Sequence, residues 1–259
     1  MRQLVRKMIR KLIIPFCFFF FIGYFYHIII SQNISLGKLA TSVKGIFLGK
    51  NIVVNDILWF LLVLFNVRIL GNIIIQKQKY FYLSLVFVLT ICIIYKINWF
   101  YIGSSLMALP FYLFGYHQRS SIYHINNTKY PFITIVLLII ATVTITQING
   151  RVSMSSFRFG HSDYLLLNIC LFYINGIIGS FLLLYIGTII KQTVFFQTVC
   201  RCAISILGLQ YIPIMIWFRV QGFNHQEYLL SFFYSLVIII ICIGFHFFCV
   251  EKVKWLSFS

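Results

Sequence analysis

The stretch Tyr164–Ile190 reads YLLLNICLFYINGIIGSFLLLYIGTII and contains no charged side chain. An α-helix of about 20 apolar residues crosses the core of a bilayer, so this stretch is long enough to span a membrane. The clearest stretches of this kind are Phe16–Ile30, Ile57–Leu64, Phe81–Tyr95, Phe132–Ile145, Tyr164–Ile190 and Tyr228–Val250. Because backbone polar groups in lipid must be paired within each segment, these stretches predict an all-α, polytopic membrane protein.

The composition points to the same class of protein. The chain has 259 residues, of which 61% are hydrophobic and 10% charged, with a mean hydropathy of +0.96. A soluble domain would carry about a quarter charged residues. The formal net charge of +17 arises from 21 Lys and Arg against four acidic residues. The basic residues sit in short loops between apolar runs, which argues against a nucleic-acid partner and favours anionic lipid headgroups and an anionic substrate.

Segment length and loop charge together predict about eight transmembrane helices. The predicted spans are Leu12–Ile30, Ile57–Ile75, Tyr80–Tyr95, Trp99–Tyr116, Pro131–Gln147, Tyr164–Ile190, Val194–Phe218 and Tyr228–Val250. The seventh is the least regular because Arg201 interrupts it. If the spans alternate from a cytoplasmic amino terminus, most basic residues fall on the inside, which predicts both termini in the cytoplasm. We expect residues 1–259 to form a single integral-membrane domain.

The basic amino-terminal segment is the first candidate for function. It contains Lys7, Arg10 and Lys11 just before the first predicted span. Such residues anchor a span by the positive-inside rule. They also suit a second role, in which an amphipathic basic segment holds the phosphates of a cytosolic donor, because guanidinium and ammonium groups bind phosphate oxygens.

Two further candidates lie in the second predicted span. Trp59, at its outer edge, either belongs to an aromatic belt or stacks on a sugar ring. Arg68 lies within the span, where its side chain either snorkels to the inner interface or serves a function, because charge inside a membrane is costly.

The predicted outside loop Ile148–Asp163 holds the densest polar cluster in the sequence. Its Arg151, Arg158 and His161 can hydrogen-bond a saccharide, and a simple solvated loop is the alternative interpretation. His225 and Glu227, in another predicted outside loop, form at most a weak acid–base pair. The sequence shows no Ser/His/Asp arrangement and no metal-ligand spacing, so it assigns no catalytic residue and no metal. The seven cysteines lie mostly within apolar runs and predict no disulfide framework.

Five motifs, taken in order along the chain, resemble one family. They are the basic residues leading into Leu12-Ile-Ile-Pro15, then Leu58-Trp59-Phe60-Leu61, Ala108–Tyr116, Asn149–Val152 and Gly176–Ser180. The ordered set resembles the acyltransferase-3 family. It is most similar to the bacterial fucose 4-O-acetylase-like membrane acyltransferases that decorate polysaccharides.

The resemblance implies a membrane O-acyltransferase of the bacterial inner membrane. Its donor would be a cytosolic acyl-CoA such as acetyl-CoA, and its acceptor a hydroxyl of a polysaccharide or lipid-linked sugar. Lys7 and Arg10, with Lys11 as an alternative register, match the family's paired cytosolic basic residues and would hold CoA. Trp59, Arg151, Arg158 and His161 would contact the acceptor.

The chain also departs from the family pattern. The family has ten membrane helices, and its first helix carries the expected catalytic His. We expect this chain to begin at the family's third helix and therefore to be an amino-terminally truncated or degenerate copy, or a reading frame started too late. Gln210 stands where the family often has a second His. A saccharide flippase or an accessory membrane subunit is the alternative from another functional class.

Overall fold

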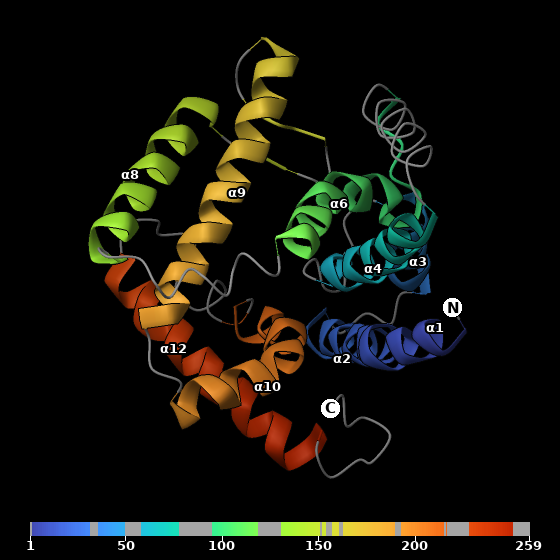
Figure 1. Ribbon diagram of the computed structural model, residues 1–259. Coiled ribbons are helices and arrows are strands. Elements are labelled where there is room, and N and C mark those ends of the chain that lie inside the picture. The colour runs from blue at the N-terminus through green and yellow to red at the C-terminus, as the bar shows by residue number, and fades with distance from the viewer. Residues whose placement is uncertain are drawn as a thin grey trace. The chain divides into compact units, whose positions relative to one another are not determined.

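The computed structural model is almost wholly helical where it describes the chain. The described residues are 2–31, 36–49, 58–77, 95–118, 131–150, 152–153, 157–160, 163–189, 193–214, 216 and 228–250. The helical elements are α1 (Arg2–Met8), η1 (Ile9–Ile13), α2 (Ile14–Ser31), α3 (Leu36–Leu48), α4 (Trp59–Lys77), η2 (Trp99–Tyr101), α6 (Ile102–His117), α8 (Pro131–Asn149), α9 (Leu165–Ile189), α10 (Val194–Leu209), α12 (Tyr228–Phe245) and η4 (His246–Val250) (Figure 1). Within these ranges no strand forms, and the predicted all-α class is confirmed.

Four helices in the described ranges are long and apolar enough to cross a membrane. They comprise Gln3–Tyr26, Trp59–Gln76, Phe132–Asn149 and Leu165–Gly187, and they correspond to the first, second, fifth and sixth predicted spans. The apolar helices Cys202–Ile214 and Tyr234–Phe248, in the seventh and eighth predicted spans, are shorter. The third predicted span lies outside the described residues except for its last one. The chain is thus an all-α membrane protein, and the number eight stays a prediction.

The outward faces of α8 and α9 show why lipid is their solvent. Phe132 is 73% exposed, Leu166 is 75% exposed and Leu183 is 70% exposed. Soluble monomers rarely expose contiguous apolar patches above a few hundred Å². A lipid environment removes the cost of exposing such side chains to water.

The chain divides into two compact units, which are described one at a time. The first comprises Met1–Asn66, Trp99–Tyr101 and Thr193–Ser259, and the second comprises Val67–Asn98 and Ile102–Gln192.

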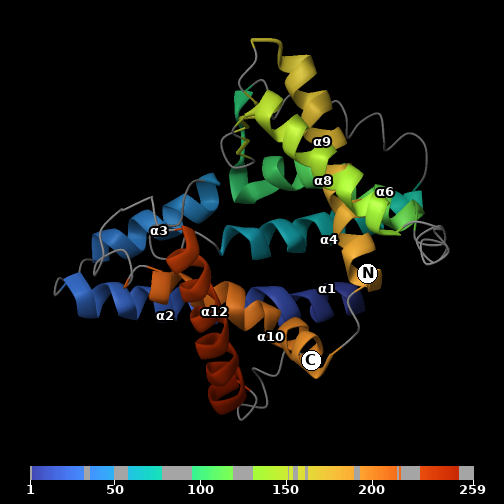
Figure 2. The same cartoon turned by 90° about the vertical axis from the view of Figure 1, so that its left-hand side faces the viewer.

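In the first unit, α1, η1 and α2 form one continuous helical stretch with a single buried face. Met8, Leu12, Phe16 and Phe19 are buried at three- and four-residue spacing, as expected for one face of a helix. Phe19 lies against Gly208 of α10, where an added Cβ would overlap the phenyl ring. The absence of a side chain at Gly208 therefore allows α2 and α10 to approach closely. α10 packs against both α2 and α12, and α12 lies across α10 (Figure 2).

In the second unit, α8 and α9 pack as a hairpin and α6 packs against α9. The Asn149-Gly150 turn signal is confirmed as the end of α8, since Gly150 has φ 70° and its N–H donates to Thr146 O at 2.8 Å. The ring of Phe111 on α6 packs against Gly176 of α9, where an added Cβ would clash with it.

Candidate functional site

Two side-chain hydrogen bonds join α10 and the residues that follow it to α12 and η4. The hydroxyl of Tyr234, on α12, donates to Pro213 O, just after α10, at 2.7 Å. Ser205 Oγ, on α10, lies 2.7 Å from His246 Nδ1, at the start of η4. The Ser205–His246 pair is therefore held where α10 and the end of the last described helix meet.

The pair is a polar contact in apolar surroundings. Ser205 is 0% exposed and His246 is 5% exposed. Cys202, Leu209 and Cys242, on the same two helices, are buried as well. A buried imidazole bonded to a hydroxyl exists in one of two forms: either Ser205 donates to a neutral Nδ1, or Nδ1–H donates to Oγ. In the first form Nδ1 is already placed to take the hydroxyl proton, which is the arrangement needed by a general base.

Both this pair and the basic segment involve π-helical turns. η4 begins at His246, and η1 contains Arg10 and Lys11. π-helical turns are rare and occur frequently at functional sites. The coincidence marks these two places in the first unit as candidates for function.

The basic segment is amphipathic, as predicted. Lys7 and Arg10 are exposed and Lys11 is half-buried, whereas Met8 and Leu12 are buried. The first predicted span begins at Leu12, but the helix starts earlier, at Arg2, so the basic residues belong to the spanning helix itself. Lys and Arg are good helix formers, and nothing in the segment breaks the helix.

The basic segment and Ser205 belong to two helical stretches that are in contact with each other. Lys11 precedes Phe19 by roughly 12 Å along the helix, and Ser205 precedes Gly208 by about 4.5 Å, at 1.5 Å per residue. Phe19 and Gly208 are in contact. With helix axes about 8–10 Å apart, Lys11 and Ser205 are separated by less than about 20 Å whichever way the helices run.

Trp59, at the start of α4, is half-buried against other aromatic rings. Its indole stacks on Tyr101 with centroids 6.1 Å apart and planes at 27°, and it meets Phe60 edge-on. Tyr101 therefore occupies one face of the indole, and a sugar ring would need the other. Arg68, farther along α4, is exposed.

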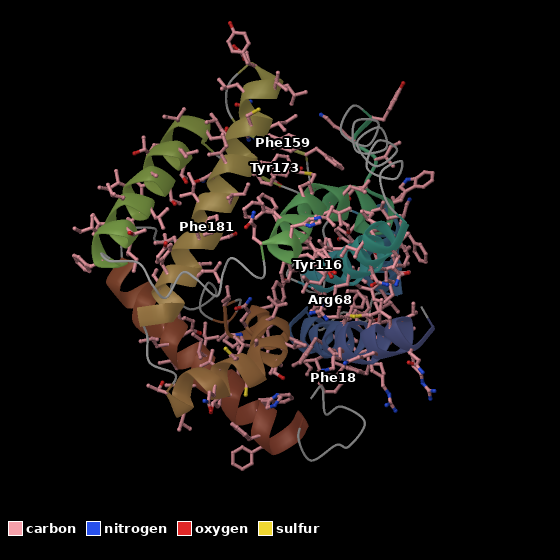
Figure 3. All side chains as sticks on the ribbon, in the orientation of Figure 1. Phe18, Arg68, Tyr116, Phe159, Tyr173 and Phe181 are labelled. Atoms are coloured by element: carbon pink, nitrogen blue, oxygen red, sulfur yellow. The ribbon has the colours of Figure 1, made fainter. Side chains whose placement is uncertain are left out.

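The described part of the predicted outside loop is anchored rather than simply solvated. Ser153 and Arg158 exchange two backbone hydrogen bonds of 2.7 and 2.9 Å. Asn149 Nδ2 donates to Phe159 O at 2.7 Å, and the ring of Phe159 packs edge-on against Phe172. Phe159 lies close to α9 near Tyr173 (Figure 3). These contacts leave the side chain of Arg158 exposed at a fixed point on the surface.

The remaining predicted acceptor residues, Arg151 and His161, lie outside the described residues, as do His225 and Glu227. Trp59 belongs to the first unit and Arg158 to the second, so each is described within its own unit. Gly160, beside the loop, has the two side-chain oxygens of Asn149 and Asn168 where a Cβ would stand.

The Ser205–His246 pair was missed at the level of sequence. The only signal available was an ionisable residue, His246, within an apolar run, which favours a function by default. Its partner is 41 positions away, so no local spacing reveals it. Comparison with protein-family models, with curated proteins and with solved structures finds no match to this chain.

Proposed function

We propose that this chain is a membrane O-acyltransferase that moves an acyl group, such as acetyl, from acyl-CoA to a hydroxyl of a polysaccharide or lipid-linked sugar. One observation carries the proposal: a buried imidazole–hydroxyl pair, Ser205–His246, lies in the same unit as an exposed basic segment. Acyl transfer from a thioester to a hydroxyl needs a base for the hydroxyl proton. A CoA donor also needs cations for its phosphates.

The donor end of the reaction falls to the basic segment. Lys7 and Arg10 are exposed and lie three positions apart on one helical stretch, so both can bind phosphate groups from the same side. Lys11, the next residue, is half-buried. In the predicted topology this segment is cytoplasmic, where acyl-CoA is found. The proposal includes both termini in the cytoplasm and eight spans in a bacterial inner membrane.

The chemistry falls to His246. Its Nδ1 accepts the proton of an attacking hydroxyl, the hydroxyl oxygen bonds to the acyl carbon, and the carbon–sulfur bond breaks. The imidazolium then returns a proton to the departing thiolate, so CoA leaves as the free thiol. The apolar surroundings exclude water, which limits loss of the acyl group to hydrolysis.

The acceptor end is assigned to the predicted outside residues. Arg158 is exposed on an anchored loop, and Arg151 and His161 are close to it in sequence. Trp59 offers one indole face to a sugar ring. Each of these residues is proposed as a saccharide contact within its own unit.

The test is transfer of label in liposomes that contain the purified chain. Radiolabelled acetyl-CoA is supplied with polysaccharide or lipid-linked saccharide, and esterified product is counted. Wild type is expected to form labelled ester and His246→Gln to form little. If wild type forms no ester but moves a labelled lipid-linked saccharide across the bilayer, the chain is a flippase and the proposal is wrong.

A further inference from the structure

Ser104 Oγ donates to Asn98 Oδ1 at 3.1 Å, but most other Ser and Thr hydroxyls with a hydrogen bond in the described helices are bonded differently from Ser205. Four of these, on Thr41, Thr146, Ser180 and Thr198, donate to the backbone carbonyl four residues earlier in the same helix, at 2.7–2.8 Å. Such back-bonding is the ordinary fate of a hydroxyl within a helix. Ser205 instead bonds to an imidazole on another helix. In the tautomer whose Nδ1 carries no proton, Ser205 donates its proton to the imidazole and not to the backbone.

We infer that Ser205 is the nucleophile that carries the acyl group, so that transfer passes through a serine ester held inside the membrane. The inference rests on the proposed function and adds a catalytic residue to it. A hydroxyl is a weak nucleophile unless an adjacent base removes its proton, and a Ser–His contact of 2.7 Å is the arrangement that does so.

The first half-reaction loads the enzyme. Ser205 Oγ attacks the thioester carbon while its proton passes to His246 Nδ1. The carbon–sulfur bond breaks, and His246 gives the proton to the thiolate, which releases CoA as the free thiol. The product is an acyl ester on Ser205, and every atom of the donor is accounted for.

The second half-reaction unloads it. The acceptor hydroxyl gives its proton to His246 Nδ1 and attacks the ester carbon. The bond to Ser205 Oγ breaks, and His246 returns the proton to Oγ. Because Ser205 and His246 are buried, loading and unloading both require the side chains around the pair to move aside while the two residues stay in contact.

A covalent intermediate suits the surroundings of this pair. Burial among apolar side chains favours an uncharged ester and keeps water from it. A two-step route also removes the need for a highly charged CoA and a polar saccharide to occupy one apolar site together. Each can then deliver or collect the acyl group in turn.

The test traps the intermediate on the full chain in liposomes. Labelled acetyl-CoA is added without acceptor, the reaction is quenched in acid, and peptides are analysed by mass spectrometry. We expect one acetyl group per chain on the peptide that contains Ser205, discharged when saccharide acceptor is added. Ser205→Ala should lose both the label and the transfer, and the matched control Ser180→Ala on α9 should keep both.

A second variant guards against misfolding of Ser205→Ala. Ser205→Cys keeps a donor beside His246, and its acetyl thioester should be cleaved by neutral hydroxylamine, whereas the wild-type oxygen ester should survive. If Ser205→Ala transfers label as fast as wild type, or if label collects on another residue, the inference is wrong while the proposed function stands. If wild type consumes no acetyl-CoA with or without acceptor, the proposed function itself is wrong.

Discussion

The hydrogen bond between Ser205 and His246 predicts a measurable energetic coupling between α10 and α12. Ser205→Ala removes the partner of a buried imidazole nitrogen and leaves it unpaired, at a cost of about 1–3 kcal/mol. His246→Leu removes the imidazole, but the Ser205 hydroxyl can then donate to the backbone carbonyl four residues earlier, so this variant costs less. The double variant replaces both partners by apolar groups, which is nearly neutral by comparison. The double variant should therefore lower the free energy of unfolding by less than the sum of the two single variants.

The magnitude of the coupling follows from these numbers and from the membrane setting. Side-chain hydrogen bonds between membrane helices contribute about 0.6 kcal/mol on average and up to about 1.7 kcal/mol. Full burial and the 2.7 Å separation place this pair near the upper end. We expect a coupling free energy of about 1–2 kcal/mol from the double-mutant cycle.

The assay is reversible unfolding in mixed micelles, followed by circular dichroism, for wild type, each single variant and the double variant. Thr198→Ala on α10 is the matched control, because its hydroxyl bonds only to Val194 O of its own helix in the described contacts. Thr198→Ala and His246→Leu should be additive. If the Ser205 and His246 effects add within about 0.5 kcal/mol, the pair is not formed and the reasoning about the site is refuted.

Three other predictions concern the donor segment, the second unit and its loop. Lys7→Gln and Arg10→Gln together should raise the KM for acyl-CoA about tenfold or more and leave kcat nearly unchanged. Steady-state kinetics at several salt concentrations measures both constants. A change confined to kcat would contradict a donor-binding role. Gly176→Val should lower the free energy of unfolding of the second unit in micelles by about 1–3 kcal/mol. Gly179 has no neighbouring atoms where a Cβ would stand, so Gly179→Val should have little effect. Equal effects of the two variants would contradict the close contact with α6. Asn149→Leu should release the outside loop and speed its cleavage by added protease, and unchanged cleavage would show that the bond to the loop backbone does not anchor it.

The long apolar helices were predictable because one physical signal dominates them. The predicted spans Pro131–Gln147 and Tyr164–Ile190 match α8 and α9 within two residues at each end. Their composition leaves no alternative to a membrane helix, and Asn149-Gly150 supplies a clear end. The start of the first predicted span is less well predicted, because basic side chains lower the hydropathy before Leu12. The helix nevertheless runs through them and begins at Arg2.

The candidate site divides into residues that the sequence points to and residues that it does not. Charge next to an apolar span is visible along the sequence, so Lys7 and Arg10 can be chosen from it, and their role as donor contacts stays a prediction. The sequence does not pair Ser205 with His246, because the two residues are 41 positions apart and meet only through the tertiary packing of α10 against η4. Acceptor contacts at Arg151 and His161 stay predictions from the sequence.

If His246 serves acyl transfer from a CoA donor, the chain must release the free thiol of CoA from acetyl-CoA, and its rate of release depends on the imidazole. Liposomes containing wild type or His246→Gln are given acetyl-CoA and saccharide acceptor, and the thiol is measured with a chromogenic disulfide. Because general-base assistance contributes about 10²–10⁴-fold, wild type should release CoA continuously and His246→Gln should be slower by at least 10²-fold. Equal rates for the two proteins, or no release above empty liposomes, would contradict the claim.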